Sequence, residues 1–561
     1  MLGYIVMKRT SHVTRICLAV LILLATALPC FAQESSSGMS ASLGALDYAA
    51  LLGYLVLIVG MGVFFSKREH STDDFFLAGR RVPWWAAALS IFGTYLSAVT
   101  FMGIPSAAFR TDWVTILINL GIILATPITI FCFVPFYRRL NVTTIYEYLE
   151  LRFSPAIRVY GSISFVFLQL AKMGVFLLLP ALALSTVTGF DVYACILIMG
   201  VLCTIYTVLG GIEAVIWTDV IQSCVLLGGG LLCVGIIFYS EQFDFSAMMS
   251  VAVTEETNKF NIFNMAGGLD TNVWWVVLIG GFFIQLVPFT SDQVIAQRFL
   301  TTSDEKGAVR SLWAHAAIVV PASLLFFGLG TALFVFYSSR PEMEPRADMA
   351  NDVLVPWFIV TQLPAGLAGL VIAGIFAATM STVDSGMHSI STSLVTDVYS
   401  KMKPNADDKQ RLKVARTLTV IAGLFGTISA VLIRNMNPES LWTTILLLVG
   451  LFGSSLTGVF LLGVFTQRAS ARGVAVGVAA SIVALLVLRL PAIIGIFGIS
   501  VEPELLAKLT IPIHGFLTAA VGVISCVVVG YIASFFLPAQ GHSIKGLTLA
   551  TLEDAEEVGQ S

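Results

Sequence analysis

Apolar runs long enough to cross a lipid bilayer recur along almost the whole chain, and they limit its fold more than any other feature. Only 12% of the 561 residues are charged, whereas 57% are hydrophobic and the mean hydropathy is +0.90. A soluble globular protein carries roughly 25% charged residues. Because backbone polar groups must be satisfied internally in lipid, these runs predict an all-α polytopic membrane protein.

Hydropathy predicts about thirteen transmembrane helices beyond the N-terminal segment. They fall near residues 43–66, 83–109, 113–137, 158–187, 190–208, 212–240, 272–296, 311–338, 355–398, 415–433, 440–466, 471–489 and 509–537. The segment 355–398 is too long for one upright crossing, so we expect it to bend or to extend beyond the membrane.

The first 32 residues have the pattern of a secretory signal peptide. A basic stretch, "MKRTSHVTR", precedes the apolar run "ICLAVLILLATALP", and small residues follow up to Ala32. The run is short for a transmembrane helix, which is the alternative reading. Cleavage after Ala32 would place the mature N-terminus outside the cytoplasm.

The distribution of Lys and Arg tests this orientation. With the N-terminus outside, twenty of these residues fall in segments predicted to be cytoplasmic and seven in outer segments. Cytoplasmic loops of membrane proteins carry such an excess. The sequence therefore predicts a multi-pass protein of the inner (plasma) membrane with a cytoplasmic C-terminus and a poorly ordered tail after residue 538. The small net charge of −3 gives no reason to expect nucleic acid as a partner.

Two of the predicted spans look interrupted. The second contains Gly93, Gly103 and Pro105, and the seventh contains Pro288 followed by a polar turn. They lie five spans apart, as corresponding helices of two five-helix repeats would. Discontinuous helices in matching positions indicate a transporter binding site, because freed carbonyl groups and helix ends can hold ions and solute. Glycine and proline are also common in membrane helices without such a role.

Three ionisable residues lie deep inside predicted spans: Lys172, Asp219 and Asp384. A charge at the centre of a membrane helix costs about 2.5 kcal/mol or more, so each needs a partner or an ion. They either mark a functional site or form a structural pair, Lys172 with Asp219 or Asp384.

One helix presents a row of oxygen atoms. Ala378, Ser381, Thr382 and Ser385 occupy positions i, i+3, i+4 and i+7, which share one helical face, and Asp384 lies at its edge. Hydroxyl groups also join membrane helices without binding ions. Hydroxyls, backbone carbonyls and one carboxylate, however, suit a hard monovalent cation such as Na⁺.

The segments "YTVLGGIEAVIWTDVIQ", "AGIFAATMSTVDSGMHSISTSLVTDVY", "TTIYEYLELRF" and "GVFLLGVFTQRAS" resemble signatures of the sodium/solute symporter family. This family includes sodium/glucose, sodium/sialic acid, iodide and monocarboxylate cotransporters. The resemblance covers about residues 45–475 and implies a LeuT-like core of five plus five helices in inverted repeats. The domains implied are an accessory helix at 43–66, repeats at 83–240 and 272–466, accessory helices at 471–537 and a tail at 538–561.

The resemblance also implies site residues. A sodium site would use the carbonyls of Gly93, Leu96 and Ala378 with the hydroxyls of Ser381 and Thr382. A second sodium site, present in some members, would use the following four residues: Asp219, Ser381, Asp384 and Ser385. The sialic acid type has serine where this chain has Asp384, so the number of sodium ions, the role of a proton and pairing with Lys172 all stay open.

For the solute, the resemblance implies a site formed by five residues: Tyr95, Ser97, Thr100, Lys172 and Gln285. Lys172 corresponds to a basic residue that binds a carboxylate in the sialic acid type. A buried cation favours an organic anion over a neutral hexose.

We therefore predict a sodium-coupled symporter that imports a small organic anion, such as sialic acid or a related sugar acid, by alternating access. A sodium/sugar or polyol symporter and a transporter-like solute sensor are the alternatives. No P-loop, HExxH or nucleophile-elbow motif occurs in a suitable setting, so the sequence does not predict an enzyme.

Overall fold

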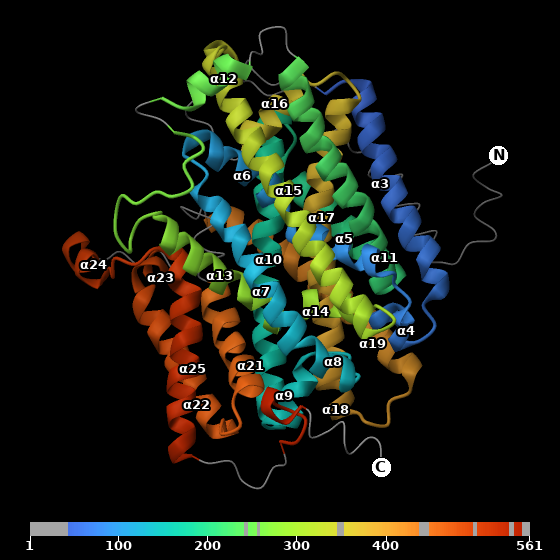
Figure 1. Cartoon of the computed structure of the whole chain (residues 1–561). Helices are drawn as coiled ribbons and strands as arrows, with labels where there is room; N and C mark the ends of the chain where they lie inside the picture. The colour runs from blue at the N-terminus through green and yellow to red at the C-terminus, as the bar shows by residue number, and fades with distance from the viewer. Residues whose placement is uncertain are drawn as a thin grey trace, which may run out of the picture.

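The protein is a bundle of long helices (Figure 1). The computed structural model describes residues 43–239, 245–254, 258–344, 353–436, 448–496, 502–537 and 544–552. Within these ranges there is no β-strand, only two isolated bridges. The predicted all-α class is confirmed. The proposed signal peptide lies outside the described residues, as does part of the predicted span 440–466.

The longer helices form the body of the bundle. They are α3 (Ala45–Phe65), α5 (Trp84–Tyr95), α6 (Ala98–Arg110), α7 (Leu117–Cys132), α10 (Pro155–Thr188), α11 (Val192–Tyr239), α13 (Trp274–Ser291), α15 (Glu305–Ser338), α17 (Leu367–Ser393), α19 (Asp408–Met436), α21 (Ser455–Phe465), α22 (Ala471–Leu488) and α25 (Thr518–Phe536).

Shorter helices lie at the breaks and ends of the bundle. They are α4 (Thr72–Leu77), α8 (Val134–Arg139), α9 (Tyr146–Arg152), α12 (Phe245–Ala252), α14 (Gln293–Leu300), α16 (Leu354–Gln362), α18 (Ser400–Met402), α23 (Leu490–Ile496) and α24 (Pro503–Leu509). We refer below to the α16 end and the α9 end of the bundle, which are the top and bottom of Figure 1.

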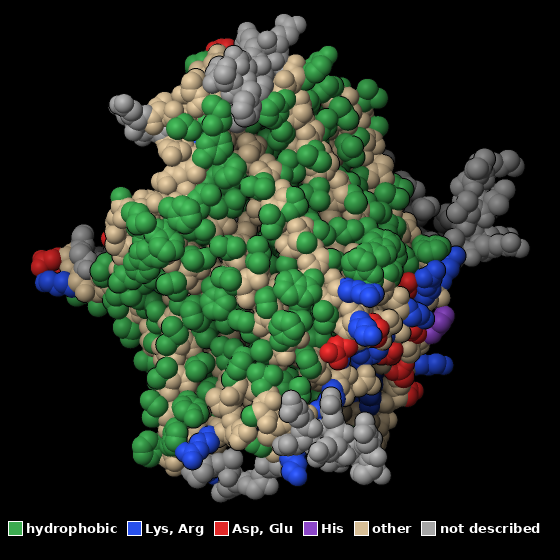
Figure 2. Space-filling model, viewed as in Figure 1, with side chains coloured by type: hydrophobic (Ala, Val, Ile, Leu, Met, Phe, Trp, Pro, Cys, Tyr) green, Lys and Arg blue, Asp and Glu red, His purple; other side chains and the backbone are tan. Residues whose placement is uncertain are grey.

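The predicted spans appear as helices of suitable length and composition. Among the described residues, ten helices can cross a membrane, and the bent pair Trp84–Tyr95 and Thr100–Arg110 adds an eleventh. The apolar helix at Val449–Phe465 is shorter than these, and residues 437–447 are not described. Figure 2 shows that the visible face is mostly hydrophobic, with charged side chains gathered over α4 and the start of α19.

Helix α11 contains two of the predicted spans. Its 48 residues would extend about 72 Å if straight, more than twice the hydrocarbon thickness of a bilayer. The chain turns at Gly211, whose φ of 56° and ψ of −157° suit only glycine. A predicted boundary between residues 208 and 212 therefore coincides with a real break inside one continuous stretch.

Both predicted interruptions are present: the first lies at other residues than the glycines and the proline noted in the sequence, and the second lies in the polar turn that follows Pro288. The first helix breaks at Leu96 and Ser97, and α5 and the following segment are inclined by 57°. Pro105 lies inside α6 and Pro288 inside α13, whereas the second break comes at Asp292, with φ −100° and ψ 119°. At both breaks a polar side chain caps the next helix, because Ser97 accepts a hydrogen bond from the Thr100 amide and Asp292 one from the Val294 amide.

Helix α17 runs through the centre of the bundle. In its most apolar window 83% of the residues are buried, compared with 33% for α19. The predicted bend in 355–398 lies between α16 and α17, where Gly366 has a φ of 88°. Since α17 is enclosed by protein, its hydroxyl and carboxyl groups must find partners on neighbouring helices.

One stretch of the C-terminal tail, residues 544–552, is more ordered than the sequence predicts. Residues 544–552 pack at the α9 end, where Tyr148 donates a hydrogen bond to the carbonyl of Leu547 (2.9 Å) and Arg139 to that of Leu552 (3.1 Å). The expectation of a poorly ordered tail is therefore wrong for these residues. A buried tyrosine hydroxyl needs a partner, and the returning tail supplies one.

Candidate functional site

The oxygen-lined face of α17 meets the broken end of α5. Ser381 donates hydrogen bonds to the carbonyls of Gly93 and Ala378, both at 3.0 Å. Thr382 lies 3.4 Å from the carbonyl oxygen of Thr94 and 3.3 Å from that of Ala378. The last turn of α5 exposes carbonyls because the helix stops there. Four of the five residues predicted to bind sodium thus lie together.

Leu96 differs from the other four. It is buried at the break after α5, and among the described residues its carbonyl accepts no hydrogen bond from a side chain of α17. The nearby carbonyl that does meet α17 belongs to Thr94, a residue that the sequence did not single out. Gly93 is required for packing as well, since a Cβ there would come within 2.6 Å of the Ser223 hydroxyl on α11.

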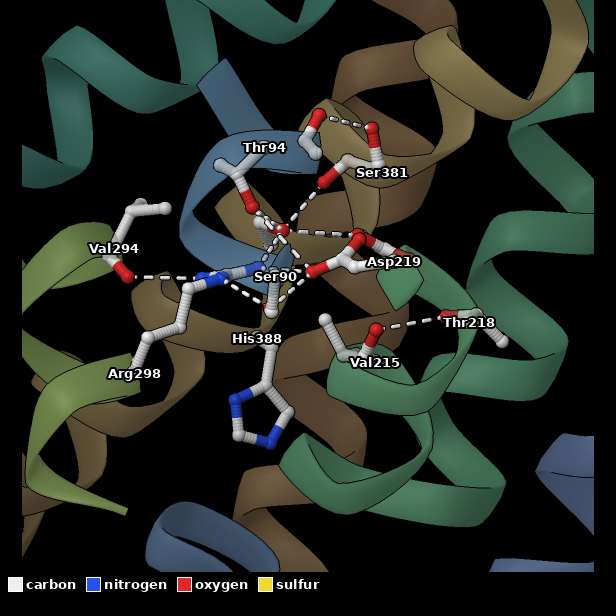
Figure 3. Close-up of polar contacts among 12 residues, drawn as sticks. Ser90, Thr94, Val215, Thr218, Asp219, Val294, Arg298, Ser381 and His388 are labelled. Carbon is white, nitrogen blue, oxygen red and sulfur yellow. Dashed lines mark hydrogen bonds and ion pairs between the residues drawn. The ribbon is translucent and has the colours of Figure 1, made fainter. Parts of the chain in front are cut away.

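A buried ion pair lies beside α17 one helical turn after Ser381 (Figure 3). The guanidinium of Arg298, on α14, donates to Asp219 Oδ2 at 2.9 Å and to Ser90 Oγ at 2.8 Å. Ser90 in turn donates to Asp219 at 2.5 Å. Arg298 also donates to Ser385 on α17. Arg298 and Asp219 are both fully buried, so their charges are compensated mainly by each other.

Asp384 lies beside this pair and shares one of its partners, Ser385. It is fully buried, and it accepts hydrogen bonds from the hydroxyls of Tyr206 and Ser385, the latter at 3.1 Å. The four residues predicted for a second sodium site are thus gathered in one cluster. Arg298, however, occupies the hydrogen-bonding positions of two of them, Asp219 and Ser385.

Arg298 corrects the sequence analysis in two ways. It is one of the twenty Lys and Arg residues in segments predicted to be cytoplasmic loops, whereas its side chain lies inside the bundle and is 0% exposed. Its presence also makes the predicted set of three intramembrane charges incomplete. The hydropathy pattern misplaced it because α14 continues the interrupted span 272–296, and the break at Asp292 brings the following turn back against α5 and α17.

The solute residues predicted from the sequence all line one cavity of about 750 Å³. The cavity extends from Asp292, at the α13–α14 junction, to Ala107, Thr115 and Thr186 near the α16 end. Thr382 also lines it, so the predicted sodium site adjoins the solute space. A volume of this size suits a small organic molecule.

The cation in this cavity is already engaged with an acid. Lys172 Nζ lies 3.6 Å from Asp292 Oδ2, and the Gln169 amide donates to both carboxylate oxygens of Asp292, at 3.1 and 2.9 Å. The structural pair considered for Lys172, with Asp219 or Asp384, is therefore wrong. Neither Asp292 nor Gln169 was predicted. Asp292 was missed because an acid at a helix break is typical of an ordinary helix cap.

The remaining solute residues form a polar rim on the same cavity. The Tyr95 hydroxyl donates to Gln285 Oε1, and Gln285 Nε2 lies 3.5 Å from the Ile118 carbonyl. Ser97 and Thr100 lie at the start of α6, with their hydroxyl oxygens 3.4 Å apart. Hydroxyl and amide groups of this kind can recognise the hydroxyl-rich face of a sugar.

The comparison with known sequences decides the family. Residues 75–480 match the sodium:solute symporter family model. The chain is 37% identical over 478 residues to the sodium/sialic acid symporter NanT of Aliivibrio fischeri, covering 85% of this chain and 94% of that protein. The chain belongs to the sodium:solute symporter family. The symporter is also 36% identical to the sodium/sialic acid symporter SiaT of Proteus mirabilis, with coverages of 85% and 95%.

Solved structures confirm the fold. A sodium-coupled sialic acid symporter in a substrate-bound, outward-open state, reported with a novel sodium site, matches with a TM-score of 0.79 and 35% identity, covering 88% of this chain and 98% of that one. The nucleobase-cation transporter Mhp1 in a closed conformation matches at a TM-score of 0.54 and 16% identity, with coverages of 82% and 94%, so it supports the fold alone. The symporter is a multi-pass membrane transporter and not an enzyme.

A largely buried network of charged side chains holds segments together at the α9 end of the symporter. Arg158, at the start of α10, pairs with Asp397 at 2.7 Å and with Glu150 at 2.6 Å. Asp397 also accepts hydrogen bonds from Thr144 at 2.6 Å and from Ser393 at 3.0 Å. The network joins the α9 region to the residues that follow α17, at the end of the bundle opposite α16.

We expect Asp397→Asn to weaken this network and so to destabilise the packing at the α9 end. Removing one partner of a buried ion pair costs about 3–5 kcal/mol, because the other charge stays buried. Amide hydrogen exchange over residues 144–158 should become faster by tenfold or more. Asp408→Asn, which changes an exposed carboxylate bonded to Thr72 at the same end, is the matched control. An unchanged rate of amide hydrogen exchange in Asp397→Asn would show that the network does not stabilise the packing at the α9 end.

Proposed function

We propose that this symporter couples the downhill entry of sodium to the uptake of sialic acid. The single observation that carries the proposal is the cavity, where a lysine and a rim of hydroxyl and amide groups adjoin the hydroxyl-lined face of α17. Sialic acid has one carboxylate and many hydroxyls, and therefore fits both parts. NanT and SiaT, which are sodium/sialic acid symporters, support the same solute.

Lys172 would bind the carboxylate of the solute. Its ammonium group is 3.6 Å from Asp292, longer than a normal charge-assisted hydrogen bond, so it can turn toward a second acid. Gln169 continues to donate two hydrogen bonds to Asp292 when the lysine turns away. Tyr95 and Gln285 lie on the same cavity and would contact hydroxyl groups.

Sodium would bind where α5 and α17 meet. The carbonyls of Gly93, Leu96 and Ala378 and the hydroxyls of Ser381 and Thr382 are the proposed ligands. The hydroxyls now donate to carbonyls, and rotation of each O–H bond would turn oxygen lone pairs toward a cation. An ion bound in this way would link the broken helix to α17 and so favour one arrangement of the two repeats.

The orientation proposed from the sequence places the α9 end in the cytoplasm and the mature N-terminus outside. Cleavage after Ala32 in the inner membrane is part of this proposal. Lys401, Lys403 and Arg411 lie at the α9 end, as the positive-inside tendency requires. The cavity then opens outward, and solute would leave after the network around Arg158 separates. The proposed repeats span 83–240 and 272–466.

Binding to the purified protein tests the solute. We expect calorimetry in sodium buffer to detect sialic acid, with at least tenfold weaker binding when potassium replaces sodium. Glucose and lactate should not compete. Preferential binding of glucose would favour a sodium/sugar symporter, and sodium-dependent binding without any transport would favour a sensor.

A further inference from the structure

We propose that a groove between α11 and α19 binds the headgroup of one anionic phospholipid, with the acyl chains of the lipid on the apolar face of α19. The proposal goes beyond the proposed function and does not depend on the solute. Three observations carry it: the groove combines basic and apolar side chains, its two lysines have no acidic partner among the described residues, and it lies where the outer face of α19 changes from charged to apolar.

The basic part of the groove comes from one face of α19. The groove is open to the surface of the bundle and has a volume of about 420 Å³. Lys409, Lys413 and Arg416 line it, and their positions i, i+4 and i+7 share one helical face. Of the described residues, no acidic one lines the groove. Basic pockets between membrane helices are suited to the phosphate of a lipid headgroup.

Apolar side chains line the rest of the groove. Leu412 is buried and Val420 is 37% exposed, both on α19, and Val208 lines the groove from α11. Beyond Val420 the outer face of α19 continues with Ile421 and Leu424, each 54% exposed. Exposed apolar side chains on a membrane helix face lipid tails. An acyl chain that leaves the groove therefore finds an apolar surface beside it.

The cations lie at the depth expected for lipid phosphates. Arg416 and Lys413 precede Val420 by about 6 and 10 Å along the helix axis. The headgroup layer is roughly 5–7 Å thick on each side of the hydrocarbon core. With Val420 at the edge of the hydrocarbon, Arg416 lies within this layer, and the long side chain of Lys413 reaches it.

The acids near the groove are engaged elsewhere. Asp407 accepts a hydrogen bond from the backbone at the start of α19 (2.7 Å), and Asp408 accepts one from the Thr72 hydroxyl (2.5 Å). Glu69 is the acid close to Arg416. Within the described part of the chain, neither lysine of the groove forms a salt bridge, and Arg416 Nε has no hydrogen-bond partner. The groove therefore presents positive charge to an anion.

An anionic phospholipid satisfies both parts of the groove. Its phosphate meets the cations and its acyl chains meet the apolar side chains, whereas a soluble phosphate would meet the cations alone. Each Lys or Arg near an anionic lipid surface strengthens binding by roughly fivefold. A zwitterionic lipid carries a cationic group beside its phosphate, which the lysines would repel. We therefore expect the groove to prefer phosphatidylglycerol to phosphatidylcholine.

Native mass spectrometry of the purified symporter tests the site without any solute. We expect one phosphatidylglycerol to bind at least tenfold more tightly than phosphatidylcholine with the same acyl chains. Lys409→Gln combined with Lys413→Gln should weaken phosphatidylglycerol binding by about 25-fold. Lys306→Gln combined with Lys403→Gln is the matched control, because it removes two exposed charges outside the groove. The control should bind phosphatidylglycerol as the wild type does.

A second variant keeps the test valid if the double lysine variant does not fold. Thr417 is exposed and lines the groove, so Thr417→Trp fills the groove and retains all three cations. We expect it to weaken phosphatidylglycerol binding by tenfold or more. Equal binding of the two lipids, or a preference for phosphatidylglycerol that survives the changes in the groove, would overturn the proposal. Displacement of the lipid by an equal concentration of glycerol 3-phosphate would assign the groove to a soluble phosphate and would also overturn it.

Discussion

Replacing Ser381 and Thr382 together with alanine is expected to abolish the sodium activation of solute uptake. Both hydroxyls lie between α17 and the carbonyls at the end of α5. A hydrogen-bonding group that contacts a charge contributes about 1.5 kcal/mol or more, so losing two should weaken sodium binding by roughly 100-fold. Uptake measured against sodium concentration in proteoliposomes gives this shift directly.

Ser391→Ala is the matched control for this variant. Ser391 lies on the same helix, is as buried as Ser381, and donates to the Ala415 carbonyl at 2.8 Å, away from α5. We expect its sodium activation to match that of the wild type. An unaltered sodium response in the double variant, at normal expression, would remove Ser381 and Thr382 from the sodium site.

Lys172→Gln is expected to weaken the binding of sialic acid by about 10- to 100-fold, because a charge-assisted hydrogen bond to a carboxylate contributes roughly 1.5–3 kcal/mol. The methyl ester of sialic acid lacks the carboxylate charge and should lose much less. Calorimetry of both ligands with both proteins measures the difference. Equal losses for acid and ester would make Lys172 a structural partner of Asp292 and not a ligand of the solute.

A double variant separates these two roles. Lys172→Gln alone leaves Asp292 buried without its cation, although Gln169 and the Val294 amide still donate to it. Adding Asp292→Asn removes that uncompensated charge. If Lys172 binds the solute, the double variant should still discriminate poorly between acid and ester. Recovery of full discrimination would show that the single variant only disturbed the packing.

Most of the spans could be predicted from hydropathy, because a bilayer requires long apolar helices wherever the chain crosses it. The turn inside α11 was predictable as a boundary, since Gly211 interrupts a run too long for one crossing. The break after α5 was placed less well. Gly93 and Pro105 attract notice in the sequence, but the chain bends at Leu96 and Ser97, where a serine hydroxyl can cap the next helix.

Helical periodicity placed Ser381, Thr382 and Ser385 on one face, and the structure has them meeting α5 and α14. Periodicity says nothing, however, about which distant residues face that surface. Arg298 and Tyr206 lie 87 and 178 positions away from their partners on α17. Pairings of this kind are set by how the helices pack, so the ion pair with Asp219 could not be predicted from local patterns.

Sodium-driven accumulation of radiolabelled sialic acid in proteoliposomes tests the central claim most directly. With an inward sodium gradient, we expect the internal concentration to rise well above the external one and to fall again when a sodium ionophore is added. An equal potassium gradient should give no accumulation. Uptake that only reaches the external concentration, or that is the same in sodium and potassium, would contradict sodium-coupled symport of sialic acid by this chain.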